Sequence, residues 1–233
     1  MLVFWLKHKL QINLLKLGYQ VTRNMPENEV KAQILNNILL SSKGVLHIGA
    51  HFAEEAEEYS NALKPVLWIE ADPKIFQTLN SRVSKFHRQQ AKRALLGDAN
   101  VSEVKFYRAS NEGASSSIFN LAYNHGFPNL KIEQELTLPM VRLDSILSTS
   151  DIESLDYWVI DVQGAELNVL RGAGGLIDLA NFILVEASNR EIYNGGVKFS
   201  DLNNFLEENS FVRLWDLGFK EHSNLIYLRR FSN

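Results

Sequence analysis

Two strand-sized apolar runs near the start of the chain restrict its fold more strongly than any other feature. One run begins at Val45 and leads into a turn at Gly49, and the other begins at Val66 and ends in an acid, Glu70. The segment between them is rich in Ala and Glu, so the stretch predicts a strand, a tight turn, a helix and a parallel strand. In such a sheet, ligands bind beyond the carboxyl ends of the strands, where an acid can accept hydrogen bonds from both hydroxyls of a ribose. Glu70 follows Gly49 by 21 positions, which suits that role, and we expect a cofactor that contains a nucleoside.

The composition of the turn separates dinucleotides and nucleoside phosphates from S-adenosylmethionine. Residues 49–54 contain a single glycine, whereas a dinucleotide turn needs several, so that backbone amides can approach the pyrophosphate. The P-loop pattern is absent from the whole chain. The four glutamates within residues 54–58 repel a phosphate but suit a sulfonium, although they also fit an ordinary solvated helix face. The sequence therefore predicts S-adenosylmethionine. Its expected contacts in this region are Gly49, Ala50, His51, Glu70 and Ala71.

Length and composition set broad limits on the protein class. The chain has 233 residues, 45% of them apolar, and a net charge of −3 from 24 basic and 27 acidic side chains. This length suits one large α/β domain, predicted at residues 43–233, with an N-terminal helical extension at residues 1–42. No broad basic field is present, so a nucleic-acid partner is not expected. The chain has no cysteine, which excludes disulfides, thiolate metal sites and a thiol nucleophile.

The first eighteen residues are both cationic and apolar. Their apolar run at residues 2–6 is interrupted by Lys7, His8 and Lys9, so it is too short for a membrane span or the core of a signal peptide. Residues 1–18 can form an amphipathic helix that makes weak contact with a membrane surface. Packing on the main domain, or on a second copy in a homo-oligomer, is the more ordinary arrangement for such a segment. We expect a cytoplasmic protein.

The remaining segments extend the sheet and interrupt it once. We expect helices at 28–41, at 73–86, from 166 to 171 and at 202–208, strands at 89–96, 157–160 and 182–185, and a closing antiparallel hairpin at 211–215 and 225–228 around Gly218. An insertion at about 99–145 breaks the alternation, with extended segments at 104–107 and 135–143 and a loop at 113–117. It would overhang the carboxyl edge of the sheet, where it can build an acceptor pocket.

Three segments together carry a family resemblance. They are Ile48-Gly49-Ala50-His51 with Glu54-Glu55, Arg142-Leu143-Asp144-Ser145-Ile146-Leu147, and Ile160-Asp161-Val162-Gln163-Gly164-Ala165-Glu166-Leu167 with Val169-Leu170-Arg171-Gly172-Ala173. In their order and separation the chain resembles the FkbM family of S-adenosylmethionine-dependent methyltransferases over roughly residues 43–230. The resemblance implies a class I methyltransferase fold, a Rossmann-like, mostly parallel seven-stranded sheet with helices on both faces and an inserted last antiparallel strand. It also implies methylation of a hydroxyl on a sugar, glycan or small natural product.

Four positions depart from the usual pattern of that family. His47 stands where an acid is common, Ala53 where glycine is common, Val159 where lysine is frequent and Gln163 where glutamate is common. With Glu70 on the ribose and Gly49 in the turn, His47 alone would not abolish cofactor binding. Gln163 removes a carboxylate near the predicted reaction centre.

Transfer of a methyl group from a sulfonium needs little more than alignment of the reactants and a base for the hydroxyl proton. Asp161 ends a predicted strand at the mouth of the sheet and is the first choice, either as the base or as a contact to the methionine part of the cofactor. It could equally cap the helix that starts near Ala165. Glu186 ends the adjacent strand and is the second choice. His125, in the insertion, is a third candidate base, or else an exposed histidine.

Other polar residues near the strand ends have binding or structural roles. Asp98 can accept a hydrogen bond from the adenine amino group, or it is an ordinary turn residue. Gln163 is expected to contact the cofactor, whereas Glu166 fits a structural role in the first turn of a helix. The serines at 115–117 can bind a polyol acceptor, or they belong to a mobile loop.

We expect no metal. Asp161 and Glu186 end neighbouring strands, and their oxygens are of the kind that magnesium prefers. However, no spacing requires such a site, and the displacement does not need an ion.

Two other functional classes stay open at this stage. One is an oxidoreductase that binds NAD or a nucleotide sugar on a similar sheet, and the other is a non-catalytic partner protein that has kept the cofactor fold. The acceptor itself is not readable from the sequence, because scattered polar residues that recognise hydroxyls leave no fixed spacing.

Overall fold

The structure is a computed structural model that describes residues 27–215 and 222–230. The chain divides into two compact units, Met1–Ser41 and Ser42–Asn233, and each is described by itself. In the first unit, helix α2 spans Glu27–Ser41, close to the helix predicted at 28–41. Residues 1–18 and Gly218 lie outside the described residues, so the amphipathic helix, its membrane or oligomer contacts and the hairpin connection stay predictions. None of the helices in the described ranges is long and apolar enough to cross a membrane.

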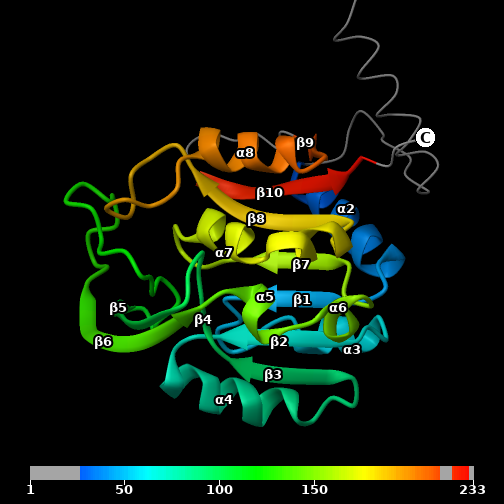
Figure 1. The fold of residues 1–233 in the computed structure, drawn as a ribbon, viewed down its shortest axis with the longest axis horizontal. Helices are drawn as coiled ribbons and strands as arrows, with labels where there is room; N and C mark the ends of the chain where they lie inside the picture. Colours follow the sequence, from blue (N-terminus) through cyan, green and yellow to red (C-terminus); the bar gives the residue numbers. More distant parts are fainter. Residues whose placement is uncertain (1–26, 216–221, 231–233) are drawn as a thin grey trace, which may run out of the picture. The chain divides into compact units, whose positions relative to one another are not determined.

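The second unit is built on a seven-stranded sheet (Figure 1). Its strand order is β3-β2-β1-β7-β8-β10-β9. The strands are β1 (Val45–Ile48), β2 (Val66–Glu70), β3 (Gln89–Arg93), β7 (Tyr157–Ile160), β8 (Phe182–Ser188), β9 (Phe211–Trp215) and β10 (His222–Arg229). Neighbours from β3 to β8 pair in parallel, whereas β10 pairs antiparallel with both β8 and β9. This arrangement confirms the predicted class I methyltransferase sheet.

The strand order reverses between β1 and β7, which makes their carboxyl ends the ligand-binding crevice of this sheet type. Ile48 and Ile160 form the last residue pair between β1 and β7. Both strands therefore end at the same level of the sheet, and the turns that follow begin at Gly49 and Asp161. Gly49 has φ +81°, and a Cβ there would overlap the carbonyl oxygen of Asp161. The turn after β1 therefore requires glycine for its backbone conformation and for the close approach of β7.

Helices flank the sheet. They are α3 (Ala56–Asn61), α4 (Pro73–Val83), α5 (Leu143–Ile146), α6 (Thr149–Ile152), α7 (Glu166–Gly172), the 3-10 helix η1 (Gly174–Leu179) and α8 (Phe199–Glu208). α4 packs on β2 and β3, and α8 packs on β8 and β9. α4 begins at Pro73 because Asp72 caps it, accepting hydrogen bonds from the N–H groups of Lys74 and Ile75. The core contains large apolar side chains with almost no exposure, among them Trp158, Phe211 and Tyr227.

His47 has a packing role inside this core. Its ring stacks on Trp68 at a centroid distance of 4.7 Å, and its Nδ1 lies 3.3 Å from the hydroxyl of Tyr59. Burial lowers the pKa of His47 to about 3, so the ring is neutral. Where the FkbM pattern commonly has an acid, this chain therefore has an uncharged aromatic ring, two residues before the turn at Gly49.

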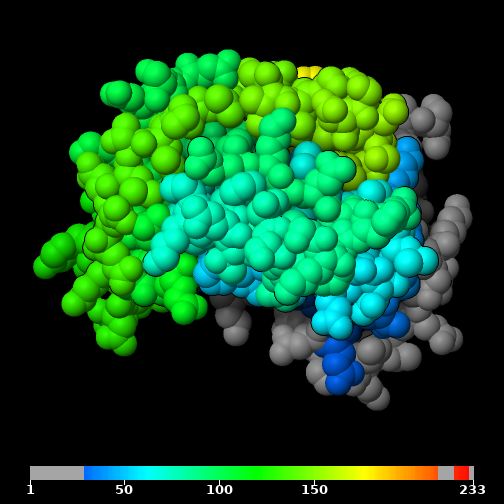
Figure 2. All heavy atoms as spheres, turned by 90° about the horizontal axis from the view of Figure 1, so that it is seen from below, coloured from blue at the N-terminus to red at the C-terminus, as the bar shows by residue number. Residues whose placement is uncertain are grey.

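The insertion forms a second, three-stranded sheet of order β4-β6-β5. The sequence predicts one strand at 89–96, but the chain leaves the main sheet at Ala94, and Leu95–Leu96 becomes β4, which pairs with β6. β5 (Val101–Ala109) and β6 (Ile132–Val141) are longer than the predicted extended segments. Figure 1 shows this green part of the chain beyond the carboxyl ends of β1 and β2, as the predicted overhang requires. In Figure 2 the green atoms project on the left, past the cyan and teal atoms.

A buried ion pair ties the insertion to the main sheet. Arg108, on β5, donates from Nε to Asp72 Oδ2 at 2.5 Å and from Nη2 to Oδ1 at 2.7 Å. The exposed fraction of the side chain is 15% for Arg108 and 0% for Asp72. Because planar, bidentate pairs fix both distance and angle, this contact fixes the position of β5 against the start of α4.

Replacing Arg108 by alanine is expected to lower the free energy of unfolding by about 3 kcal/mol, because the buried Asp72 carboxylate loses its cation. Lys105, on the same strand, forms an exposed ion pair with Glu135 and supplies the control. Lys105→Ala should leave the free energy of unfolding close to that of the wild type, because an exposed ion pair contributes little. Urea unfolding of both variants measures the difference, and similar losses would contradict the role assigned to Arg108.

Candidate active site

The crevice between β1 and β7 contains a cavity, here called the β1–β7 cavity. Its lining includes six of the residues that the sequence assigns to the cofactor, namely Gly49, His51, Glu70, Ala71, Asp161 and Gln163. The rest of the lining includes Leu95 of β4 and, from the insertion, Phe106, Gly113 and Ile118. The strand ends supply the polar side of this cavity and the insertion supplies an apolar one, as a nucleoside with a polar ribose and a flat base requires.

Glu70 is buried at the end of β2, and its carboxylate is held by backbone N–H groups. Oε2 accepts from His51 at 2.9 Å and Oε1 accepts from Asp72 at 2.8 Å. Burial raises the pKa of Glu70 to about 7, although both backbone hydrogen bonds act in the opposite direction. Each carboxylate oxygen can accept a further hydrogen bond, so Glu70 can receive two hydroxyl groups of a ribose.

This raised pKa predicts a pH-dependent affinity for the cofactor product S-adenosylhomocysteine. Glu70 is ionised above about pH 7, and the charged form is the stronger acceptor. The affinity is therefore complete above pH 7 and should fall as the pH decreases through 7, by up to about tenfold per pH unit. Calorimetry between pH 5.5 and 8.5 measures this, with Glu70→Gln as a matched control that binds weakly and without this dependence. Equal affinities across the range would remove the ribose assignment.

His51 adopts a left-handed backbone conformation with φ +45°, and both ring nitrogens have neighbours. Nδ1 lies 2.9 Å from Glu54 Oε1, and Nε2 lies 3.2 Å from the carbonyl oxygen of Glu112 in the insertion. The ring thus joins the first turn to the insertion at the edge of the β1–β7 cavity. A role in shaping the site stays the prediction for His51.

Two predicted cofactor residues do not line the cavity. Ala50 is buried, and its N–H donates to the carbonyl oxygen of Ile69 at 3.1 Å. Asp98 is half-buried, and its carbonyl oxygen accepts from Arg142. The adenine contact of Asp98 therefore stays a prediction, whereas the aromatic ring of Phe106 lies in the cavity wall.

A second polar group lies where the pairing of β7 with β8 ends, and we call Asp161, Gln163, Glu186 and Tyr193 the Gln163 cluster. Glu186 lies inside β8, which continues to Ser188 instead of ending before it. Gln163 Nε2 donates to Asp161 Oδ1 at 2.5 Å and to Glu186 Oε2 at 3.0 Å. The hydroxyl of Tyr193 donates to Gln163 Oε1 at 2.6 Å. The two predicted catalytic carboxylates are therefore adjacent, joined by one amide.

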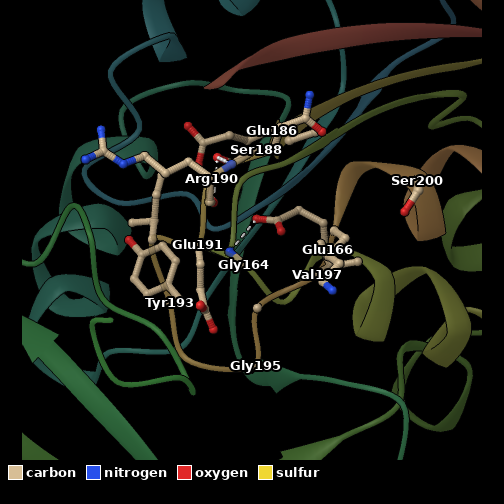
Figure 3. A pocket seen from close by; sticks show the side chains of 15 residues that line it. Gly164, Glu166, Glu186, Ser188, Arg190, Glu191, Tyr193, Gly195, Val197 and Ser200 are labelled. Atoms are coloured by element: carbon tan, nitrogen blue, oxygen red, sulfur yellow. Dashed lines mark hydrogen bonds between the residues drawn. The ribbon is translucent and has the colours of Figure 1, made fainter. Parts of the chain in front are cut away.

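Glu166 lies next to this cluster but supports the backbone. It is buried, and its Oε1 accepts from the N–H groups of Val162 and Gly164 at 3.1 and 3.0 Å (the latter is drawn in Figure 3). Burial raises the pKa of Glu166 to about 8, and the charges of Glu186 and Asp161 add to this effect. These contacts fit the structural role expected from the sequence.

Carboxylate oxygens of Asp161, Glu166 and Glu186 lie within 4.8 Å of one another, a spacing that ligands of a divalent cation also show. The amide nitrogen of Gln163 already contacts two of these carboxylates. The expectation of no metal stays a prediction.

Two more cavities meet at the Gln163 cluster. The insertion cavity is lined by Ser110, Asn111, Ser115, Phe127, Asn129, Leu130, Gln163, Glu186, Ile192 and Tyr193. The loop cavity, drawn in Figure 3, is lined by Gly164, Glu166 and residues of the segment 186–200. Glu186 and Tyr193 line both, and Gln163 lines the insertion cavity and the β1–β7 cavity. The cluster is therefore the meeting point of all three cavities.

The structure does not bring His125 into the cluster. Its Nδ1 accepts from the N–H of Phe127, its ring stacks on the Phe127 ring, and it lines none of the three cavities above. Phe127, two residues later, lines the insertion cavity in its place. A catalytic role for His125 stays a prediction.

Sequence reasoning did not identify Tyr193. Its position depends on pairing between distant loops, since Leu121 and Tyr193 form an isolated antiparallel bridge. The only local signal is the pair Gly195-Gly196 after it, which marks a loop but not the partner of that loop.

Comparison with known proteins agrees with this geometry. Residues 45–213 match the family described as the methyltransferase FkbM domain. The chain is 24% identical over 177 residues to the 2-O-methyltransferase NoeI of Sinorhizobium fredii (strain NBRC 101917 / NGR234), which covers 72% of each chain. A solved structure of an uncharacterized protein from Listeria monocytogenes serotype 4b superimposes with a TM-score of 0.51 at 9% identity, covering 91% of this chain and 70% of that one. This likeness concerns the fold alone.

The family match extends over most of the main domain and includes all three motifs that carry the resemblance in the sequence. It confirms the predicted enzyme class and the predicted cofactor. This chain belongs to the FkbM methyltransferase family and uses S-adenosylmethionine as its methyl donor.

Proposed function

We propose that this enzyme methylates a hydroxyl group of a polyhydroxylated acceptor, such as a sugar, a glycan or a small natural product. The observation that carries the proposal is the position of Glu186. Its carboxylate lines both acceptor-side cavities and lies one amide away from Asp161, which lines the β1–β7 cavity.

The two carboxylates take different roles in this proposal. Bound S-adenosylmethionine supplies an electrophilic methyl group on a cationic sulfur. As the new O–CH3 bond forms and the S–CH3 bond breaks, Glu186 accepts the proton that the hydroxyl loses. Asp161, on the cofactor side, contacts the methionine part. Glu70 holds the ribose, and the insertion excludes water from the reacting atoms.

The lining of the insertion cavity supports a polyol acceptor. Ser110, Asn111, Ser115 and Asn129 carry hydrogen-bonding groups, and Phe127 adds an apolar surface. Alternating hydroxyls and C–H faces of a sugar match such a mixture. The relative from Sinorhizobium fredii is described as a 2-O-methyltransferase, which supports oxygen as the atom that receives the methyl group. A cytoplasmic location stays a prediction.

Transfer of a radiolabelled methyl group to a panel of free sugars, oligosaccharides and polyhydroxylated natural products tests the proposal. We expect label in an O–CH3 group, located by NMR, with the wild type. Label on nitrogen or carbon would contradict it, and cofactor binding without transfer to any acceptor would favour the non-catalytic alternative. Titration with NADH should produce no energy transfer from tryptophan, because membership in a methyltransferase family argues against the oxidoreductase alternative.

A further inference from the structure

Gln163 holds an unfavourable backbone conformation that its surroundings fix. It is a non-glycine residue with φ +56°, in the left-handed region that residues with a side chain rarely adopt. Its carbonyl oxygen accepts from Ser117 Oγ at 2.7 Å, and the N–H groups on either side of it, of Val162 and Gly164, bind Glu166. Strain that is maintained by several contacts is typical of functional positions.

The side chain of Gln163 is fixed at both ends. Its oxygen accepts from Tyr193, so its nitrogen must point the other way, toward Asp161 and Glu186. Tyr193 is in turn placed by its own loop: the N–H of Ala122 donates to the carbonyl oxygen of Ile192, and the ring packs on Gly164, where a Cβ would lie 3.0 Å from Tyr193 Cδ2. The amide therefore has one orientation.

We propose that Gln163, oriented by Tyr193, is a positioning residue that supplies one N–H donor to each of two carboxylates. It holds Asp161 and Glu186 adjacent, and it aims Glu186 at the acceptor cavities. An amide does this without adding charge, whereas a carboxylate at 163 would only accept hydrogen bonds. The inference deepens the proposed function, because it rests on Glu186 as the base.

Charge explains why an amide suits this position. The titratable groups that face Gln163 come from the turn after β7, from α7, from β8 and from the loop after β8. They are Asp161, Glu166, Glu186 and Tyr193. Arg190, Glu191 and Lys198 line the loop cavity beyond Glu186. A fourth carboxylate at position 163 would repel those of Asp161 and Glu186 directly, so the group would retain a proton at neutral pH.

The isosteric variant Gln163→Glu tests the proposal through activity. We expect the acid limb of the pH profile of kcat to move up by at least one unit and kcat at pH 7 to fall at least tenfold. Tyr193→Phe keeps the ring and should lower kcat by three- to tenfold. Tyr123→Phe, at a side chain that is 98% exposed, should leave kcat unchanged.

A second readout does not need an acceptor. In Gln163→Glu the pKa of the added carboxyl is higher in the folded state than in the unfolded state. The variant therefore loses stability as the pH rises through the folded-state pKa. The Tm difference from wild type should therefore grow between pH 5 and pH 8. The charge-exchange variant Gln163→Glu/Glu186→Gln moves the amide to position 186 and restores the wild-type number of carboxylates in the cluster, so it should remove most of that growth.

The two readouts separate this inference from the proposed function. If wild type methylates a hydroxyl but Gln163→Glu keeps its kcat and pH profile, the inference is wrong and the proposed function stands. If no hydroxyl acceptor is found but the Tm difference grows with pH and is removed by charge exchange, the arrangement of the cluster is supported while the function is not. A Tm difference that is constant with pH would overturn the inference in either case.

Discussion

Replacement of Glu186 by glutamine is expected to lower kcat by about 10²- to 10³-fold, the usual contribution of a general base. Glutamine keeps the shape of the side chain and an oxygen that accepts from Gln163 Nε2, so the cluster should keep its geometry. Only the ability to take a proton is lost. The measurement is methyl transfer at saturating acceptor, together with calorimetry of S-adenosylhomocysteine, which should bind with unchanged affinity.

Two comparisons make this result specific. Glu208→Gln, at an exposed position that ends α8, should behave as wild type. Asp161→Asn should mainly weaken cofactor binding, because Asp161 lines the β1–β7 cavity. If Asp161→Asn abolished turnover at saturating cofactor while Glu186→Gln had little effect, the roles of the two carboxylates would be exchanged.

Gly49→Ala is expected to lower the free energy of unfolding by about 3 kcal/mol or more, since it combines overpacking with a positive φ. The added methyl group would overlap the carbonyl oxygen of Asp161, so β1 and β7 must separate at the crevice. Because both strand ends line the β1–β7 cavity, cofactor affinity should fall at least tenfold in whatever fraction still folds. Urea unfolding and calorimetry measure the two effects.

Gly175→Ala is the matched control for this change. Gly175 lies in η1, and no atom would lie within 4 Å of a Cβ placed there, so its stability should change by less than about 1 kcal/mol. A Gly49→Ala variant as stable as the Gly175→Ala variant would show that the two strand ends can separate without cost.

Much of the sheet could be predicted because its signals are local. The run that ends at Ile48, the glycine that follows and the acid at Glu70 all lie within one strand–helix–strand unit, so apolar pattern and turn chemistry specify them together. The division of residues 89–96 into β3 and β4 was missed, because both halves are suitable strand sequences. Only their partners differ, β2 for one and β6 for the other.

The acceptor side could be predicted only in part. Asp161 and Glu186 were found because each follows a buried apolar run, although β8 continues past Glu186 to Ser188, and adjacent parallel strands bring such residues together. Tyr193 was not, since its contact with Gln163 requires the loop after β8 to pair with residue 121 of the insertion. Hydrogen bonds between irregular segments leave no periodic trace in a sequence.

The contacts of Asp72 link two events that a methyltransferase must coordinate. Its N–H donates to Glu70, and its carboxylate pairs with Arg108 of the insertion. A ligand that binds Glu70 therefore acts on a residue that also holds the insertion in place. Occupancy of the β1–β7 cavity and stability of the insertion are expected to rise together, and thermodynamic reciprocity requires the converse.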